Sequence, residues 1–163
     1  MTLFKKRAAA FAALAGLCVG APAQAACWSD EEASAAQVRD LETMLMVSAL
    51  RCRLVGQDFL ADYNHLIETS RPALTAVNDT LRAHFAHGLG ARASLDAYDH
   101  YVTTIANRYG AGAVGLGCDD MASILSAANA EGGSAAGLAR LAQAAGVQPV
   151  MDEGLCVQEL AVR

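Results

Sequence analysis

The stretch SDEEASAAQVRDLETMLMVSALRCR, from Ser29 to Arg53, decides the fold of this chain. Ser29 followed by Glu32 at the third position after it is the pattern of a capping box, which satisfies unpaired backbone N–H groups at the start of a helix. Small and apolar side chains then recur at helical spacing and predict one buried stripe: Leu41, Met44, Leu45, Ser48 and Cys52. The stretch therefore predicts a long helix over 30–53, ended by Gly56.

The rest of the chain carries further helical patterns and no alternating strand pattern. Pro72 is expected to start one helix, and Ser94 and Ser134 are expected to cap two others. We expect Gly110 to end the helix after Ser94 in a left-handed conformation. The expected buried stripes lie within 59–67, 74–85, 121–128 and 138–145, and one more consists of Leu95, Tyr98, Val102, Ile105 and Tyr109. A last short helical turn is expected over 155–162. The sequence thus predicts an all-α fold, a single disulfide-stapled helical bundle of about five to six helices.

The first residues have the pattern of a secretory signal peptide. Basic residues at 5–7 precede an apolar run over 8–19, and Ala23-Gln24-Ala25 is a small-residue cleavage site. We expect residues 1–25 to be a signal peptide and residues 26–163 to form a single all-helical domain. The expected localisation is therefore periplasmic or secreted.

The charge of the mature chain argues against two classes of partner. Three of the twelve basic side chains lie within 1–25, which leaves nine against seventeen acidic ones and a net charge of about −8. Such a surface repels nucleic-acid phosphates and anionic lipid. We expect no nucleic-acid partner and no membrane insertion after signal cleavage, and the expected partner is an unknown protein or small molecule.

Four cysteines remain after the leader: Cys27, Cys52, Cys118 and Cys156. An even number in an exported chain is typical of two disulfides, and no pair has the C-x-x-C spacing of a zinc site. A continuous helix over about 25 residues would separate Cys27 from Cys52 by roughly 37 Å, whereas a disulfide needs Cα atoms within about 7 Å. Two pairings survive. We favour Cys52–Cys118 with Cys27–Cys156, by a slight margin over Cys27–Cys118 with Cys52–Cys156.

Gly110, Gly112 and Gly115 have the spacing G-x-G-x-x-G of a dinucleotide-binding fingerprint. A true fingerprint follows a buried strand and belongs to a βαβ unit. Here the preceding segment, 95–109, has a helical stripe, although 102–105 has some strand character. We therefore predict a loop at the end of a helix and no cofactor.

Other side chains suggest chemistry without deciding it. Arg51 and Arg53 could bind a carboxylate ligand or partner, but ion pairs with Asp58 or Asp62 are the ordinary interpretation. The aromatic residues that could wall a ligand pocket are Trp28, Tyr63, Tyr98, Tyr101 and Tyr109. The residues that could form a zinc or copper site are His84, His87, Asp96, Asp99 and His100.

Several motifs resemble those of a family of small exported alphaproteobacterial helical proteins with a Cys-Trp pair after the signal peptide. These are Cys27-Trp28-Ser29, the run TMLMVSALRCR over 43–53 with its LRCR motif, RPAL over 71–74, and Tyr109-Gly110 with Cys118 downstream. The resemblance covers most of the mature chain and implies an exported helical protein. Some members carry the name S-adenosyl-L-homocysteine hydrolase, but the family motifs have no assigned chemistry, so no catalytic or cofactor residue is carried over.

The expected function is that of a non-catalytic exported helical protein, an interaction or structural module. The alternatives are a periplasmic protein that binds a small ligand or a metal and, less favoured, a hydrolase like the named relatives. The only site residues predicted are the four disulfide cysteines; no catalytic residue, cofactor or metal ligand is assigned.

Overall fold

The computed structural model describes residues 27–156. The described chain forms helices and no strand element: α1 (Asp30–Leu54), α2 (Leu60–Thr69), α3 (Arg71–Ala86), α4 (Ala91–Tyr109), α5 (Cys118–Ala130) and α6 (Ala135–Ala144). The predicted all-α fold with two disulfides is confirmed. The expected signal peptide, residues 1–25, lies outside the described residues.

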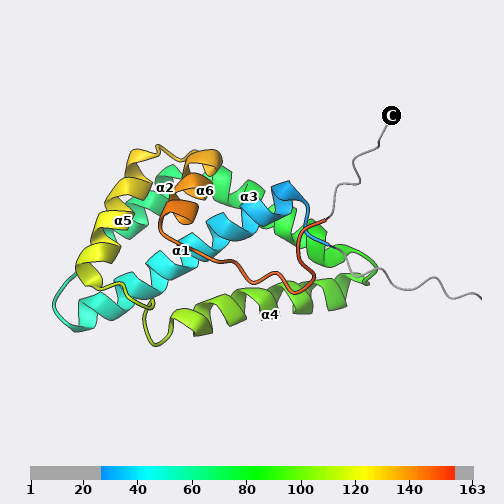
Figure 1. Ribbon diagram of the computed structural model, residues 1–163, viewed down its shortest axis with the longest axis horizontal. Helices are drawn as coiled ribbons and strands as arrows, with labels where there is room; N and C mark the ends of the chain where they lie inside the picture. The colour runs from blue at the N-terminus through cyan, green and yellow to red at the C-terminus, as the bar shows by residue number, and fades with distance from the viewer. Residues whose placement is uncertain (1–26, 157–163) are drawn as a thin grey trace, which may run out of the picture.

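α1 is the central helix, and all five other helices contact it. Figure 1 shows α1 crossing the molecule between α4 on one side and the group of α2, α5 and α6 on the other. Its capping box is present as predicted, because Ser29 and Glu32 exchange hydrogen bonds. The predicted stripe is buried, and so are polar side chains on other faces: Asp40, Glu42 and Thr43.

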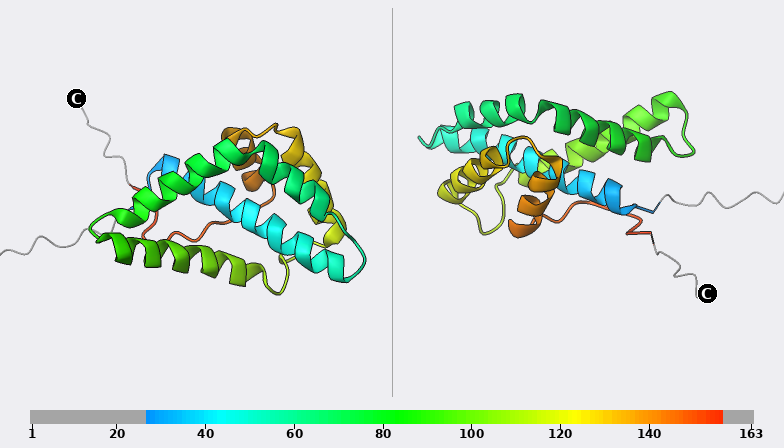
Figure 2. Two further views of the ribbon diagram at one scale, coloured as in Figure 1. Left: turned by 180° about the vertical axis from the view of Figure 1, so that it is seen from behind. Right: turned by 90° about the horizontal axis from the view of Figure 1, so that it is seen from above.

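α3 and α4 form an antiparallel pair joined by the short loop 87–90, and they diverge from that loop with α1 between them (Figure 2). At the other end of α3, buried Ser70 separates it from α2. None of the described helices is long and apolar enough to cross a membrane.

Both disulfides have the pairing that we favoured. Cys52–Cys118 joins the last turn of α1 to the first residue of α5, with Cα atoms 5.7 Å apart. Cys27–Cys156 joins the two ends of the described chain, with Cα atoms 4.9 Å apart. Two disulfides are typical of a protein that folds in an oxidising compartment.

The start and the stripe of α4 were predicted wrongly. α4 begins at Ala91 after an N-cap at Gly90, whereas Ser94 was expected to cap it. The alanines at 91 and 93 favour helix strongly, so the helix forms one turn earlier. Leu95 is 51% exposed and does not belong to the buried stripe, which contains Tyr101 instead.

Two expectations about chain ends and turns were also wrong. Gly110 follows α4 with φ −56°, a right-handed conformation, and Gly112 and Gly115 are the loop residues with positive φ. Leu155 lies in an isolated parallel bridge with Trp28 and not in a helical turn. The remainder of the expected last turn, 157–162, lies outside the described residues.

Candidate functional site

A buried ionic network fixes α4 on α1. Asp40 of α1 has no exposed surface, and it accepts hydrogen bonds from Tyr109 (2.5 Å) and from the guanidinium of Arg108. Burial raises the pKa of Asp40, and the hydrogen bonds from Tyr109 and Arg108 offset part of that rise. Removal of one partner would therefore leave a buried polar or charged group unsatisfied.

The segment after α6, residues 148–156, crosses the molecule as an extended strap and ends beside the start of α1 (Figure 1). At its near end, Nη1 of Arg108 donates to the carbonyl oxygen of Gln148 at 2.7 Å. At its far end, the amide of Trp28 donates to Gly154 and the amide of Cys156 donates to Trp28, both at 2.9 Å. The Cys27–Cys156 disulfide closes the same end covalently. The strap is thus fastened at both ends.

Trp28 lies in a cluster of rings beneath the strap. Its ring stacks on His84 of α3 with 3.8 Å between centroids, and it meets the rings of Phe85 and Tyr101 at 5.9 Å and 5.8 Å. Trp28, His84 and Tyr101 are buried, while Phe85 is half-buried. The Tyr101 hydroxyl has no hydrogen-bond partner among residues 27–156.

His84 also contacts the acid of the α1 capping box. Its Nδ1 lies 3.2 Å from Oε1 of Glu32. Burial raises the pKa of Glu32, but hydrogen bonds from Ser29 and the contact with His84 outweigh it and lower the pKa overall.

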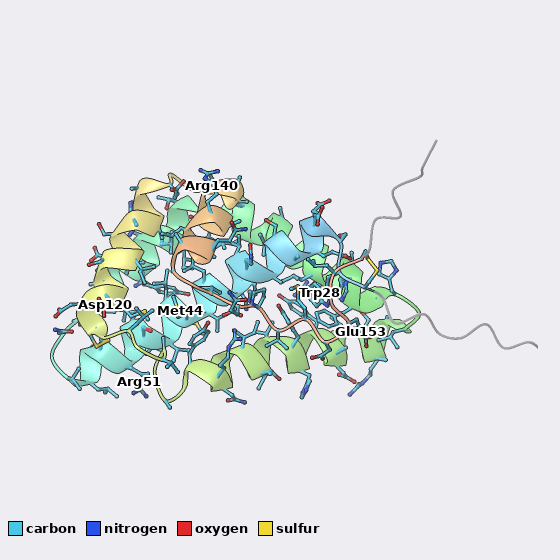
Figure 3. All side chains as sticks on the ribbon, in the orientation of Figure 1. Trp28, Met44, Arg51, Asp120, Arg140 and Glu153 are labelled. Atoms are coloured by element: carbon cyan, nitrogen blue, oxygen red, sulfur yellow. A yellow bond between two sulfur atoms is a disulfide. The ribbon has the colours of Figure 1, made fainter. Side chains whose placement is uncertain are left out.

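These elements enclose an open groove of about 1090 Å³ between the α3–α4 pair and the strap. Its size is close to that of known ligand pockets, about 300–1,000 Å³. Figure 3 shows Trp28 and Glu153 close together at this end of the molecule. The principal side chains that line it are those of Trp28, His84, Phe85, His100, Tyr101 and Glu153.

When the histidines are counted as uncharged, the charged side chains among the described lining residues of the groove are acidic. Asp152 and Glu153 of the strap are exposed side chains that line it, and neither forms an ion pair within the described residues. Its described lining contains no lysine or arginine. The lining therefore combines aromatic surface with hydrogen-bond acceptors and negative charge.

Of the aromatic residues considered as pocket walls, Trp28 and Tyr101 line the groove. The other three have hydroxyls that donate inside the bundle: Tyr63 to Glu42 at 2.5 Å, Tyr98 to Asn78 at 2.8 Å, and Tyr109 to Asp40. Burial and the neighbouring carboxylate raise the pKa of Tyr63 and of Tyr109. These three tyrosines hold helices together.

The structure separates the residues that the sequence suggested as a possible zinc or copper site. His84, His87 and His100 all line the groove, whereas Asp96 lies 3.8 Å from Arg92 on the exposed side of α4. Within residues 27–156, no three histidine, cysteine or acidic side chains lie close enough together to hold a metal ion. The three histidines have in common that they line the same groove.

The two arginines beside Cys52 have different partners. Arg53 lies 3.4 Å from Asp58, so the predicted ion pair is confirmed for it. Arg51 instead donates to the backbone carbonyl of Gly110. That bond holds the glycine-rich loop against the end of α1, and the segment before the loop is helical, as predicted.

The strap carboxylates and the contact of Trp28 with His84 were not foreseen from the sequence. The preferred pairing of Cys27 with Cys156 was the one signal available, because it places residues 150–155 next to Trp28. No family model, curated protein or solved structure matches the chain, so the resemblance to exported alphaproteobacterial proteins stays a prediction.

Proposed function

We propose that this chain is a non-catalytic periplasmic or secreted binding protein, and that the groove between the α3–α4 pair and the strap holds a small ligand. The observation that carries the proposal is a groove of about 1090 Å³ lined by His84, His100 and the strap acids, with the buried rings of Trp28 and Tyr101 in its wall. An aromatic-lined groove with a few convergent polar groups is the common form of a ligand site. This favours ligand binding over a purely structural module.

The construction of the walls supports the same proposal. The groove lies on helices fixed by the buried Asp40 network, and its remaining wall is fixed at one end by Arg108 and at the other by a disulfide. A site preorganised in this way loses little conformational entropy when a ligand binds. The disulfides and the expected signal peptide support an exported location.

The groove contains a fluorescence reporter, because Trp28 lines it and is the only tryptophan of the chain. We expect its fluorescence to change saturably when the mature oxidised protein is titrated with small aromatic probes: phenethylamine, phenethyl alcohol and hydrocinnamate. Failure of all three probes to bind would contradict the proposal.

A matched pair of variants localises the binding. Ala97 is half-buried and lines the groove, whereas Ala93 is exposed one turn earlier on α4 and does not line it. Ala97→Phe fills the groove and is expected to weaken probe binding about tenfold, or roughly 1.4 kcal/mol. Ala93→Phe is expected to leave the affinity unchanged. Equal effects of the two substitutions would place the bound probe elsewhere.

A further inference from the structure

The groove has a consistent chemical preference, and this inference about its ligand rests on the proposed function. Apolar ring surface is supplied mainly by Phe85, which is half-buried; Trp28 lies edge-on to it with 5.9 Å between centroids and is itself almost completely buried. Such surface favours an aromatic or aliphatic ligand body through burial of apolar area.

The two carboxylates of the groove are acceptors. The carboxylates of Asp152 and Glu153 accept hydrogen bonds and carry negative charge, and neither is neutralised by an ion pair within the described residues. A ligand group that supplies donors and positive charge matches both carboxylates.

The lining disfavours the opposite charge. An anionic ligand would lie next to two carboxylates with no lysine or arginine among the described lining residues. Like charges in a partly desolvated site repel, and the net charge of about −8 on the mature chain adds to that repulsion over longer distances.

We propose that the groove selects ligands that carry a protonated amine on an aromatic or apolar body, with the amine bound by Asp152 and Glu153 and the body packed against Phe85. The ligand class is thus an arylalkylammonium or similar cation.

Three phenylethyl probes of different charge test the selection: phenethylamine and its isostere phenethyl alcohol, and the anion hydrocinnamate. At about pH 8, above the ordinary titration range of histidine, we expect the protonated amine to bind about tenfold more tightly than the alcohol, as two partly exposed charge contacts allow. Hydrocinnamate should bind least well.

The double variant Asp152→Asn with Glu153→Gln removes both charges from exposed positions of the strap. It should bring the amine to the affinity of the alcohol and leave the alcohol within about twofold of its original affinity. The control, Glu68→Gln with Asp79→Asn, changes the net charge equally at exposed positions that do not line the groove. It should keep the preference for the amine.

The outcomes separate the two proposals. Equal binding of amine and alcohol to the unaltered protein would overturn the amine selection and leave the ligand groove standing. Loss of the preference in the control variant, or its persistence in the strap variant, would overturn the role of Asp152 and Glu153. Failure of every probe to bind would overturn the proposed function and this inference together.

Discussion

Arg108 of α4 donates to the carbonyl oxygen of Gln148 with one nitrogen and to the buried carboxylate of Asp40 with the other. A single guanidinium therefore joins the central helix, the helix that carries half of the groove and the first residue of the strap. The planar donor fork of arginine suits such a three-way junction, which an ammonium on a flexible stem does not reproduce.

Arg108→Met leaves the Asp40 carboxylate buried with only Tyr109 as a partner. We expect the free energy of unfolding to fall by roughly 2–3 kcal/mol, less than for a fully buried ion pair because the arginine side chain is partly exposed. Urea denaturation measures the change. Arg92→Met, which removes an exposed pair with Asp96, should cost less than about 1 kcal/mol. Equal losses in the two variants would show that Asp40 does not depend on Arg108.

The two disulfides are expected to differ in what they support. Loop-closure entropy gives about 5 kcal/mol for Cys27–Cys156 and about 4 kcal/mol for Cys52–Cys118, from separations of 129 and 66 residues. Replacing Cys27 and Cys156 by serine frees the end of the strap, so probe binding should weaken about tenfold. Replacing Cys52 and Cys118 should lower stability and spare binding. Probe titration and thermal unfolding of both variants check this, and a binding loss confined to the Cys52–Cys118 variant would contradict it.

Alkaline pH should destabilise the bundle through its buried tyrosines. Burial, and next the nearby carboxylates, raise the pKa of Tyr63, Tyr101 and Tyr109 above the ordinary value. A group whose pKa is raised by folding stabilises the fold below its unfolded pKa, about 10 for tyrosine, and that stability is lost as pH rises beyond it. Urea denaturation at stepped pH should show stability falling above about pH 10, by up to about 1.4 kcal/mol per pH unit for each tyrosine.

Two tyrosine variants separate the contributions of individual hydroxyls to this loss of stability at alkaline pH. Tyr101→Phe removes a buried hydroxyl without a partner in the described chain, so it should leave stability at neutral pH unchanged or raised and reduce the alkaline loss. Tyr109→Phe removes the hydrogen bond to Asp40 and should cost about 1–3 kcal/mol at neutral pH. If Tyr101→Phe proved the more damaging of the two at neutral pH, its hydroxyl would have a partner in solution.

Gly133 in the turn between α5 and α6 should tolerate no side chain. A Cβ there would lie 2.5 Å from the carbonyl oxygen of Thr69, and the residue has φ +80°. Gly133→Ala combines that clash with the left-handed cost of about 1–2 kcal/mol. Gly132→Ala is the control, because φ is +62° and a Cβ would meet nothing within 4 Å. Thermal unfolding should show the larger loss of stability for Gly133→Ala. Similar losses for the two variants would mean that the C-terminal end of α2 moves away from the added methyl group.

The helices were predictable because their signals are local, and the length of α1 reduced the three possible disulfide pairings to two. The Ser29 cap, the α1 stripe and the exclusion of Cys27–Cys52 all depend on one continuous helix. The error at Ser94 has the same origin, since a serine at helical spacing resembles a cap even where alanines let the helix start earlier.

The groove was only partly predictable, because it is made by residues far apart in the chain. Trp28 and His100 were noticed singly, but nothing in their spacing places them beside Glu153. Tyr63 and Tyr109 resembled pocket walls as much as Tyr101 did, and only packing shows that their hydroxyls turn inward to Glu42 and Asp40. Tertiary neighbours decide such cases, and sequence spacing does not.

The bridge between Trp28 and Leu155 makes the groove depend on the last part of the described chain. The wall that carries Asp152 and Glu153 is complete when that segment meets Trp28, and the Cys27–Cys156 disulfide then holds it there. During synthesis or export, a chain whose final segment has not yet arrived has rings and histidines but no opposing wall. Under the proposed function, full binding strength therefore comes only after this late segment has docked against Trp28 and its disulfide has formed.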